Sequence, residues 1–169
     1  MILLIGGARS GKSTTAVCLA SKSGLPVTIV ATAEARDEEM AARIARHRAE
    51  RPAQWRTLEC PLDLHLAVTS TESGDFLVID CLTLWVSNLL GADRSGQEIL
   101  AEGARVAEAL RSRHGVVVSN EVGLGIVPAN ELARIYRDVL GGVNAAFAAA
   151  AERSLFMVAG RATELTLVE

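Results

Sequence analysis

The chain has 169 residues and a formal net charge of −3 at pH 7, from 17 Lys and Arg against 20 Asp and Glu. Half of the residues are hydrophobic and 22% are charged, which excludes a disordered chain and predicts a single globular domain over residues 1–169. This acidic balance also disfavours a nucleic-acid-binding protein, because such proteins usually carry a strongly basic face.

Short β-branched apolar runs alternate with longer helical patterns along the chain, which is typical of a parallel sheet built from β-α-β units. Strands are predicted at 2–5, 26–31, 56–59, 76–79, 116–119 and 155–158, with an edge strand at 165–168 that pairs back through 160–164. Helices are predicted at 11–23, 37–50, 61–71, 82–90 and 97–113, and a last helical pattern runs over 128–140, is broken by Gly141-Gly142 and resumes over 143–153. The fold class is therefore α/β, with a mostly parallel sheet flanked by helices and an antiparallel C-terminal edge strand.

The cysteines and the apolar runs indicate a cytoplasmic protein. Cys18, Cys60 and Cys81 have no C-x-x-C spacing, so we expect reduced, mostly buried thiols and neither disulfides nor a zinc site. No apolar stretch reaches about 18 residues without a charge, so no membrane span is predicted. The apolar run at 1–5 has no basic flank and stops at two glycines, unlike a signal peptide.

Residues 6–13, with the sequence GGARSGKS, match the phosphate-loop pattern G-x-x-x-x-G-K-[ST] in full. The segment follows a predicted strand and opens a predicted helix, as the motif requires. Its glycines let backbone N–H groups turn around phosphate oxygens, and the helix N-terminus adds a positive dipole end. Lys12 is predicted to reach the β- and γ-phosphates and Ser13 to bind Mg²⁺. The alternative is a glycine-rich turn with an incidental lysine.

Asp80 directly follows the apolar strand predicted at 76–79. A phosphate-loop protein needs a second carboxylate on the metal side, at the end of a neighbouring strand, and Asp80 meets that need. The other interpretation is that Asp80 caps the N-terminus of the next helix. From the local pattern both interpretations stay open.

His47 lies in an arginine-rich segment that also contains Arg43, Arg46, Arg48 and Arg51. Clustered guanidinium groups bind phosphate oxygens, and a neutral imidazole beside them is a competent nucleophile toward phosphorus. The alternative is a solvated helix face, with Glu39 and Arg43 paired four residues apart and His47 at the edge of the core. His65 and His114 are predicted to be structural or solvated.

The segment 120–128, NEVGLGIVP, follows the strand predicted at 116–119. Loops at the carboxyl ends of parallel strands form the ligand crevice of open α/β sheets, so this loop belongs at the site by topology. Its glycines alternatively serve only as turn residues. The sequence contains no N-K-x-D, which argues against the guanine-reading pattern of switch GTPases.

Six segments together resemble the bifunctional adenosylcobinamide kinase / adenosylcobinamide-phosphate guanylyltransferase family: GGARSGKS at 6–13, ATA at 31–33, EMAARIARH at 39–47, RPAQWRTLE at 51–59, VIDCLTLWVSNLL at 78–90 and SNEVGLGIVP at 119–128. The resemblance runs from the first strand through the final helix. It implies phosphorylation of the aminopropanol hydroxyl of adenosylcobinamide with ATP or GTP. It also implies transfer of GMP from GTP onto that phosphate, which gives adenosylcobinamide-GDP for cobalamin synthesis.

The resemblance further implies a RecA-like P-loop fold, a homotrimer, and roles for particular residues. The guanylylated histidine of the family falls on His47, with Lys12 as the second catalytic residue. Its nucleotide contacts fall on Gly6, Gly7, Ala8, Arg9, Ser10, Gly11, Lys12, Ser13, Ala31, Thr32, Ala33, Arg48, Ala49, Glu50, Arg51, Glu59 and Asp80, with Ser13 and Asp80 on Mg²⁺. The chain departs from some relatives at Thr14-Thr15, where a basic residue often follows the serine, and it is short between Leu90 and Gln97 and at the C-terminus.

Two rival functions remain open from the sequence. One is a small P-loop kinase of another metabolite, in which the arginine-rich helix is a lid and His47 is incidental. The other is a nucleotide-dependent switch or binding module, which the missing N-K-x-D disfavours.

Overall fold

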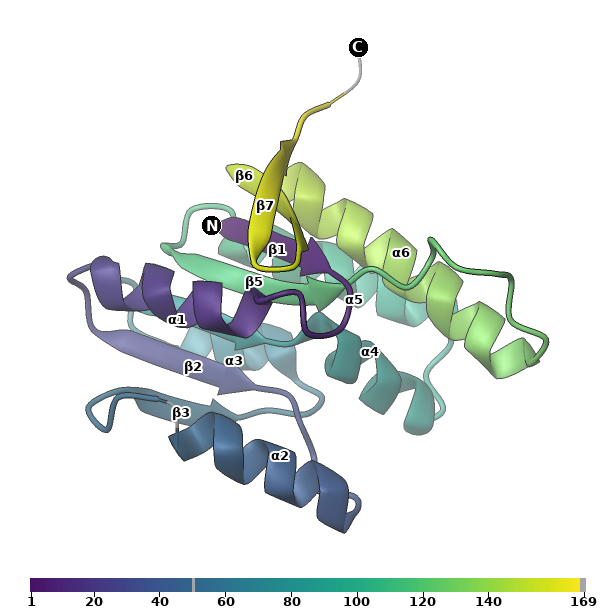
Figure 1. Ribbon diagram of the computed structural model, residues 1–169, viewed down its shortest axis with the longest axis horizontal. Helices are drawn as coiled ribbons and strands as arrows, with labels where there is room; N and C mark the ends of the chain where they lie inside the picture. Colours follow the sequence, from purple (N-terminus) through teal and green to yellow (C-terminus); the bar gives the residue numbers. More distant parts are fainter. Residues whose placement is uncertain (50, 168–169) are drawn as a thin grey trace.

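A computed structural model describes residues 1–49 and 51–167. Its centre is a seven-stranded sheet with the strand order β3-β2-β4-β5-β1-β6-β7 (Figure 1). The strands are β1 (Ile2–Gly6), β2 (Val27–Ala31), β3 (Arg56–Glu59), β4 (Phe76–Asp80), β5 (Gly115–Asn120), β6 (Arg153–Val158) and β7 (Arg161–Leu165). Neighbouring strands are parallel except β6 and β7, which are antiparallel. The predicted α/β fold with an antiparallel C-terminal edge strand is therefore confirmed.

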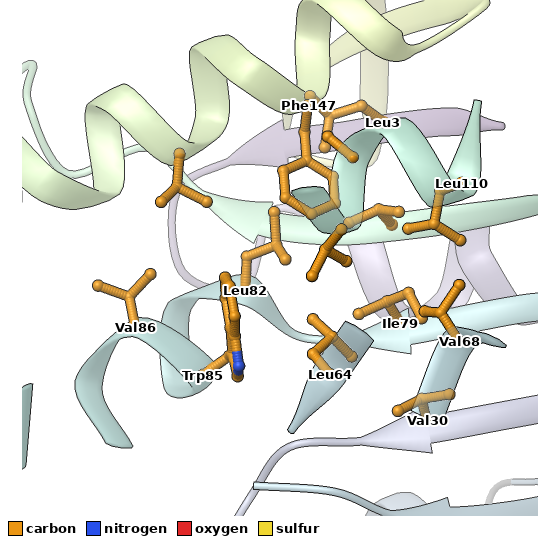
Figure 2. Close-up of a cluster of buried hydrophobic side chains, with 14 of the residues drawn as sticks. Leu3, Val30, Leu64, Val68, Ile79, Leu82, Trp85, Val86, Leu110 and Phe147 are labelled. Atoms are coloured by element: carbon orange, nitrogen blue, oxygen red, sulfur yellow. The ribbon is translucent and has the colours of Figure 1, made fainter. Parts of the chain in front are cut away.

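The helices cover the two faces of the sheet unequally. They are α1 (Lys12–Lys22), α2 (Glu38–Ala49), α3 (Leu64–Ser70), α4 (Leu82–Gly91), α5 (Gly96–Leu110) and α6 (Glu131–Ala150). Side chains of α3, α4, α5 and α6 pack against one face in the larger hydrophobic cluster, which includes Leu3, Ile79, Trp85 and Phe147 (Figure 2). On the other face α1 contributes Ala16 and Ala20 to a smaller cluster. No residue of α2 is fully buried, so the burial of side chains does not by itself determine where this helix lies against the sheet.

Helix α6 runs without a break through Gly141 and Gly142, so the predicted interruption at these residues is wrong. Glycine lowers helix propensity, but tertiary packing overrides that preference here. A Cβ at Gly142 would overlap the Leu100 side chain, and one at Gly103 would lie 3.1 Å from Val143 Cγ2. Glycines on both helices thus let α5 and α6 pack closely. The helix ends at Ala150 because Arg153 already begins β6, beside β1.

The last strand lies earlier than predicted. Strand β7 covers Arg161–Leu165 and follows a tight turn at Ala159 and Gly160, whose φ angles are +50° and +73°. This short turn pairs Arg161 with Val158. The residues before 165, which were expected only to lead into the edge strand, therefore form that strand themselves. Of the range predicted as strand, Leu165 belongs to β7 and Val168 lies outside the described residues.

Within residues 1–49 and 51–167, none of the helices combines the length and the apolar character that a membrane crossing requires. The three cysteines are free thiols. Cys60 is buried, Cys81 is half-buried and Cys18 is exposed on α1, so the expectation that the thiols are mostly buried is wrong for Cys18. The register of α1 turns this residue away from the sheet while Ala16 and Ala20 face it.

Candidate functional site

The phosphate loop connects β1 to α1 and folds around the ammonium group of Lys12. Lys12 Nζ donates hydrogen bonds to the carbonyl oxygens of Gly6 at 2.8 Å and Gly7 at 2.7 Å, and to Ser10 Oγ at 3.2 Å. Gly11 stands at the N-cap of α1 with φ +97°, a conformation that favours glycine. Burial lowers the pKa of Lys12, and the nearby charge of Arg43 lowers it further, while Cys81 and Asp80 oppose this shift.

Only glycine fits at the first position of the loop. A Cβ at Gly6 would overlap the carbonyl oxygen of Met157 on β6, the strand that pairs with β1. The turn after β6 also contacts the loop, since the N–H of Gly160 donates to the carbonyl of Ser10 at 2.9 Å. The loop is therefore positioned by the C-terminal strand pair, which the local motif does not reveal.

Asp80 ends β4 and faces a guanidinium and an imidazole from the arginine-rich segment. Its Oδ2 lies 3.3 Å from an Arg51 guanidinium nitrogen and 3.8 Å from His47 Nδ1. Burial raises the pKa of Asp80, but the His47 imidazole and the Arg51 charge outweigh burial and hold this pKa below its ordinary value. Cys81, not Asp80, occupies the N-cap of α4, so the interpretation of Asp80 as the cap of that helix is wrong.

Two cavities meet at His47, Arg51 and Asp80, which line both of them. The first cavity has a volume of about 270 Å³ and lies against α1. Ser13 and Thr14 line it on the phosphate-loop side, and its other lining residues are Ala16, Val17, Ile29, Val78 and Val118. Hydroxyl and carboxylate oxygens are ligands that Mg²⁺ prefers, so Ser13 and Asp80 on one cavity fit such an ion. Among the described residues, no three His, Cys, Asp or Glu side chains form a metal cluster.

The second cavity, of about 50 Å³, lies between α2 and the carboxyl ends of β2 and β3. Its polar lining includes Arg48 and Glu59, which form an ion pair with each other. Its remaining lining residues are Ala31, Ala33, Met40, Arg43, Ile44, Cys81 and Leu84. The cavity thus combines apolar walls with the side chains of the arginine-rich helix and, at one end, the carboxylate of Glu59 that pairs with Arg48.

Thr32 directly follows β2, next to this cavity, but its side chain is fully buried. Its hydroxyl donates to the carbonyl of Cys81 at 2.7 Å and accepts from the Cys81 N–H at 2.9 Å. The amide of Asn88 on α4 donates to the carbonyls of Thr32 at 2.7 Å and Pro61 at 3.2 Å. Thr32 therefore braces the ends of β2 and β4, with its hydroxyl committed to the backbone.

Several other predicted residues lie at the rim or away from the cavities. Gly7, Ala8 and Arg9 are exposed on the outer side of the phosphate loop, and Ala49 is exposed at the end of α2. Glu50 lies outside the described residues. His65 is half-buried on α3 and His114 is exposed before β5, and neither lines either of these two cavities.

The sequence did not single out Thr14 and Met40 as residues of the site, although they line the two cavities, and it left open which arginine of the segment 43–51 lies there, where Arg43 now lines the second cavity. The helical spacing of Arg43 and His47, four residues apart, is a signal that both face the same side of α2. Asn88 gives no comparable signal, because its role depends on contacts with segments 27 and 56 positions earlier in the chain.

A family model described as cobinamide kinase / cobinamide phosphate guanyltransferase matches residues 2–165, nearly the whole chain. The chain belongs to this family. The predicted resemblance is thereby confirmed.

Curated relatives are similar to this chain over nearly their full lengths. The bifunctional adenosylcobalamin biosynthesis protein CobP of Pseudomonas aeruginosa is 51% identical over 161 residues, which cover 94% of this chain and 92% of the relative. The proteins of the same description named CobU are 41% identical in Salmonella typhimurium and 42% in Escherichia coli, each over 175 residues that cover 95% of this chain and 96% of the relative.

Proposed function

We propose that this protein phosphorylates adenosylcobinamide with ATP or GTP and then transfers GMP from GTP to the product. The result is adenosylcobinamide-GDP, an intermediate of cobalamin biosynthesis. Membership of the family supports both activities. The observation that carries the second activity is the position of His47, which lines the cavity of the phosphate loop and also contacts Asp80.

In the kinase step, the acceptor hydroxyl attacks the γ-phosphorus and the nucleoside diphosphate leaves. Catalysis of this reaction depends on positioning and on charge stabilisation, which the phosphate loop and Lys12 supply. Ser13 and Asp80 fit a Mg²⁺ ion, because both are oxygen donors on the same cavity and the lowered pKa of Asp80 keeps its carboxylate ionised. When bound, Mg²⁺ would neutralise charge on the triphosphate.

In the guanylyl step, a ring nitrogen of His47 attacks the α-phosphorus of GTP and pyrophosphate leaves. The phosphate of adenosylcobinamide phosphate then attacks the same phosphorus and displaces the histidine. A neutral imidazole is a nucleophile near pH 7, and its protonated form is a good leaving group. Asp80, 3.8 Å from Nδ1, supports an orientation in which Nε2 faces the substrate.

The second cavity suits the guanine base. A guanine edge offers N1–H and N2–H₂ donors, and a carboxylate is the side chain that accepts from both. Glu59 supplies this carboxylate at one end of the cavity and would also keep its ion pair with Arg48, since a carboxylate accepts several hydrogen bonds, while Ile44 and Leu84 supply apolar walls. We assign Ala31, Thr32, Ala33, Arg48, Arg51 and Glu59 to this end of the nucleotide site, with Thr32 acting through the backbone that it braces, while Ala49 and Glu50 stay nucleotide contacts that the resemblance alone predicts.

Three further properties belong to the proposal. The chain acts as one domain over residues 1–169, in the cytoplasm, and it assembles as a homotrimer. Apolar residues exposed after β5 support an interface between subunits, since contiguous apolar patches on soluble proteins mark interaction sites.

The test is the variant His47→Asn. It should still convert adenosylcobinamide to its phosphate, because transfer of the γ-phosphoryl group needs no protein nucleophile. It should form no adenosylcobinamide-GDP and retain no label from GTP labelled at the α-phosphate. The label on the wild-type protein should be stable in alkali and lost in acid, as expected for phosphorus bound to an imidazole nitrogen.

His65→Asn is the matched control, since His65 lies on α3 outside both cavities. It should be labelled and should turn over like the wild type. A His47→Asn protein that still makes adenosylcobinamide-GDP at the wild-type rate would remove His47 from the mechanism. The protein would then be better described as a P-loop kinase in which His47 is incidental.

A further inference from the structure

Asn120 stands at the end of the strand that lies between the two strands of the phosphate site. Strand β5 has β4, which ends at Asp80, on one side and β1, which ends at Gly6, on the other. In the parallel register Asn120 lies opposite Gly6, and Val118 lies opposite Asp80. Asn120 therefore occupies the carboxyl edge of the sheet between the phosphate loop and Asp80.

The alternation of β5 places Asn120 on the face of the first cavity. Val116 and Val118 belong to the hydrophobic cluster beneath α1, and Val118 lines the cavity together with Ser13 and Asp80. Residues two positions apart in a strand share a face, so Asn120 has the same orientation as Val118, one step closer to the edge. Ser119 has the opposite orientation, and its hydroxyl donates to Asn144 Oδ1 at 2.6 Å.

Hydrogen bonds from two helices and a tie to the phosphate loop hold the backbone at Asn120. Its N–H donates to Thr83 Oγ1 at 2.9 Å, and its carbonyl accepts from Asn144 Nδ2 at 3.0 Å. The N–H of Glu121, one residue later, donates to the carbonyl of Gly6 at 3.2 Å. Among the hydrogen bonds of the described residues, none uses the carboxamide of Asn120. A rigid backbone thus carries a side chain with two N–H donors at the edge of the site.

We propose that Asn120 is a further catalytic residue of the kinase step, whose Nδ2 donates a hydrogen bond to an oxygen of the γ-phosphoryl group during transfer. This inference rests on the proposed function. In that step a bond forms between the acceptor oxygen and the γ-phosphorus, and the bond from the γ-phosphorus to the β–γ bridging oxygen breaks. The electron pair stays on the bridging oxygen of the diphosphate, and the hydroxyl proton passes to water. An amide donor at this place stabilises the charge spread over the γ-oxygens.

The guanylyl step makes a different demand on the same residue. There the bond that breaks joins the α-phosphorus to the α–β bridging oxygen, so the charge develops away from the γ-phosphoryl oxygens. A contact to the γ-phosphoryl group therefore contributes little to that step. Loss of a catalytic contact at Asn120 should therefore slow the kinase step alone, whereas loss of a structural role should slow both steps.

The experiment compares Asn120→Ala and Asn120→Asp with the wild type in two assays. Transfer of label from γ-labelled GTP to adenosylcobinamide reports the kinase step. Transfer of label from α-labelled GTP to supplied adenosylcobinamide phosphate reports the guanylyl step. Asn120→Ala should lower the kinase kcat by about 100-fold, the usual effect of removing one transition-state donor, and leave the KM for adenosylcobinamide and the guanylyl rate close to wild type. Asn120→Asp keeps the shape but introduces a charge that repels phosphate, so its kinase kcat should fall at least as far.

Asn130→Ala is the matched control, since the same substitution there removes only the cap of α6, where Asn130 Oδ1 accepts from the Ala133 N–H. It should lower the melting temperature without changing either rate. A wild-type kinase kcat in Asn120→Ala, or a parallel loss of both activities with a lowered melting temperature, would overturn the role of Asn120 alone. A wild-type protein that makes no adenosylcobinamide phosphate would overturn the proposed function, and this inference with it.

Discussion

Lys12 is one of only two lysines in the chain, and the other, Lys22, lies exposed at the end of α1. The pair therefore provides a variant and its control within one helix. Lys12→Ala should lower phosphoryl transfer by about 100-fold or more, roughly 3 kcal/mol of transition-state stabilisation, because a positioned charge on the β- and γ-phosphates is lost. Steady-state kinetics with GTP and adenosylcobinamide measures this loss.

Lys22→Ala should retain wild-type kinetics, since its charge interacts only with the C-terminal end of α1. Circular dichroism should show a folded Lys12→Ala protein. Wild-type turnover by that protein would contradict the assignment of residues 6–13 as a functional phosphate loop.

Tyr136 is the single tyrosine of the chain, so its ionisation is visible without interference from another phenol. Burial raises the pKa of Tyr136 to about 12, and the nearby Cys81 contributes in the same direction. The neutral phenol, whose hydroxyl donates to the carbonyl of Thr83 at 3.3 Å, is thus the form that the folded state favours. Phenolate absorbance should appear near pH 12 in the native protein and near pH 10 in the protein unfolded in urea.

The raised pKa of Tyr136 makes the folded protein less stable as the pH rises. A pKa that is raised on folding stabilises the protein below the unfolded value, and this contribution is lost as the pH rises through the folded value. The free energy of unfolding should therefore decrease between about pH 10 and pH 12, and less so in Tyr136→Phe. Equal slopes in the two proteins would contradict the burial of this phenol.

At the level of elements, the contact between α5 and α6 depends on glycines inside both helices. Gly141 is exposed and a Cβ there meets nothing within 4 Å, whereas Gly103 is buried and a Cβ there lies 3.1 Å from Val143 Cγ2. Gly141→Ala should raise the free energy of unfolding by about 1 kcal/mol, the difference in helix propensity. In Gly103→Ala the same gain in helix propensity is opposed by overpacking, because the new methyl group presses against the stiff β-branched side chain of Val143.

Urea denaturation of Gly141→Ala and Gly103→Ala tests this pair. The first should be more stable than the wild type, and the second should gain less or lose stability. Equal gains in both proteins would mean that Gly103 does not set the distance between the helices.

At the level of the whole molecule, the loop after β5 and the start of α6 expose an apolar patch. Its members are Val122, Leu124, Ile126, Val127, Leu132 and Ile135, with Ile126 98% and Leu124 81% exposed. If this patch forms the interface of the proposed trimer, the double variant Leu124→Ser/Ile126→Ser should elute as a smaller species, because each subunit loses buried apolar area. Light scattering after size-exclusion chromatography gives the mass.

Leu66→Ser is the control, since Leu66 is 66% exposed on α3 and lies outside the patch. It should keep the mass of the wild type. A double variant that also keeps this mass would move the interface to another surface, and a monomeric wild type would refute the trimer.

The local sequence determined the alternation of strands and helices, the phosphate loop and the place of Asp80 at a strand end, because these depend on apolar periodicity and on glycine spacing within a few residues. It did not determine whether His47 is a solvated residue or part of the site. Apolar periodicity predicts helix α2, but it does not predict where a helix without fully buried residues packs, and only the tertiary structure brings His47 and Arg51 to Asp80. Packing also determines that α6 is continuous. The local sequence predicts a break at Gly141 and Gly142, but Gly142 lies against Leu100 of α5 inside an unbroken helix. The position of Asn120 between Gly6 and Asp80 follows from the strand order, which depends on how crossovers arrange strands that are distant in the chain.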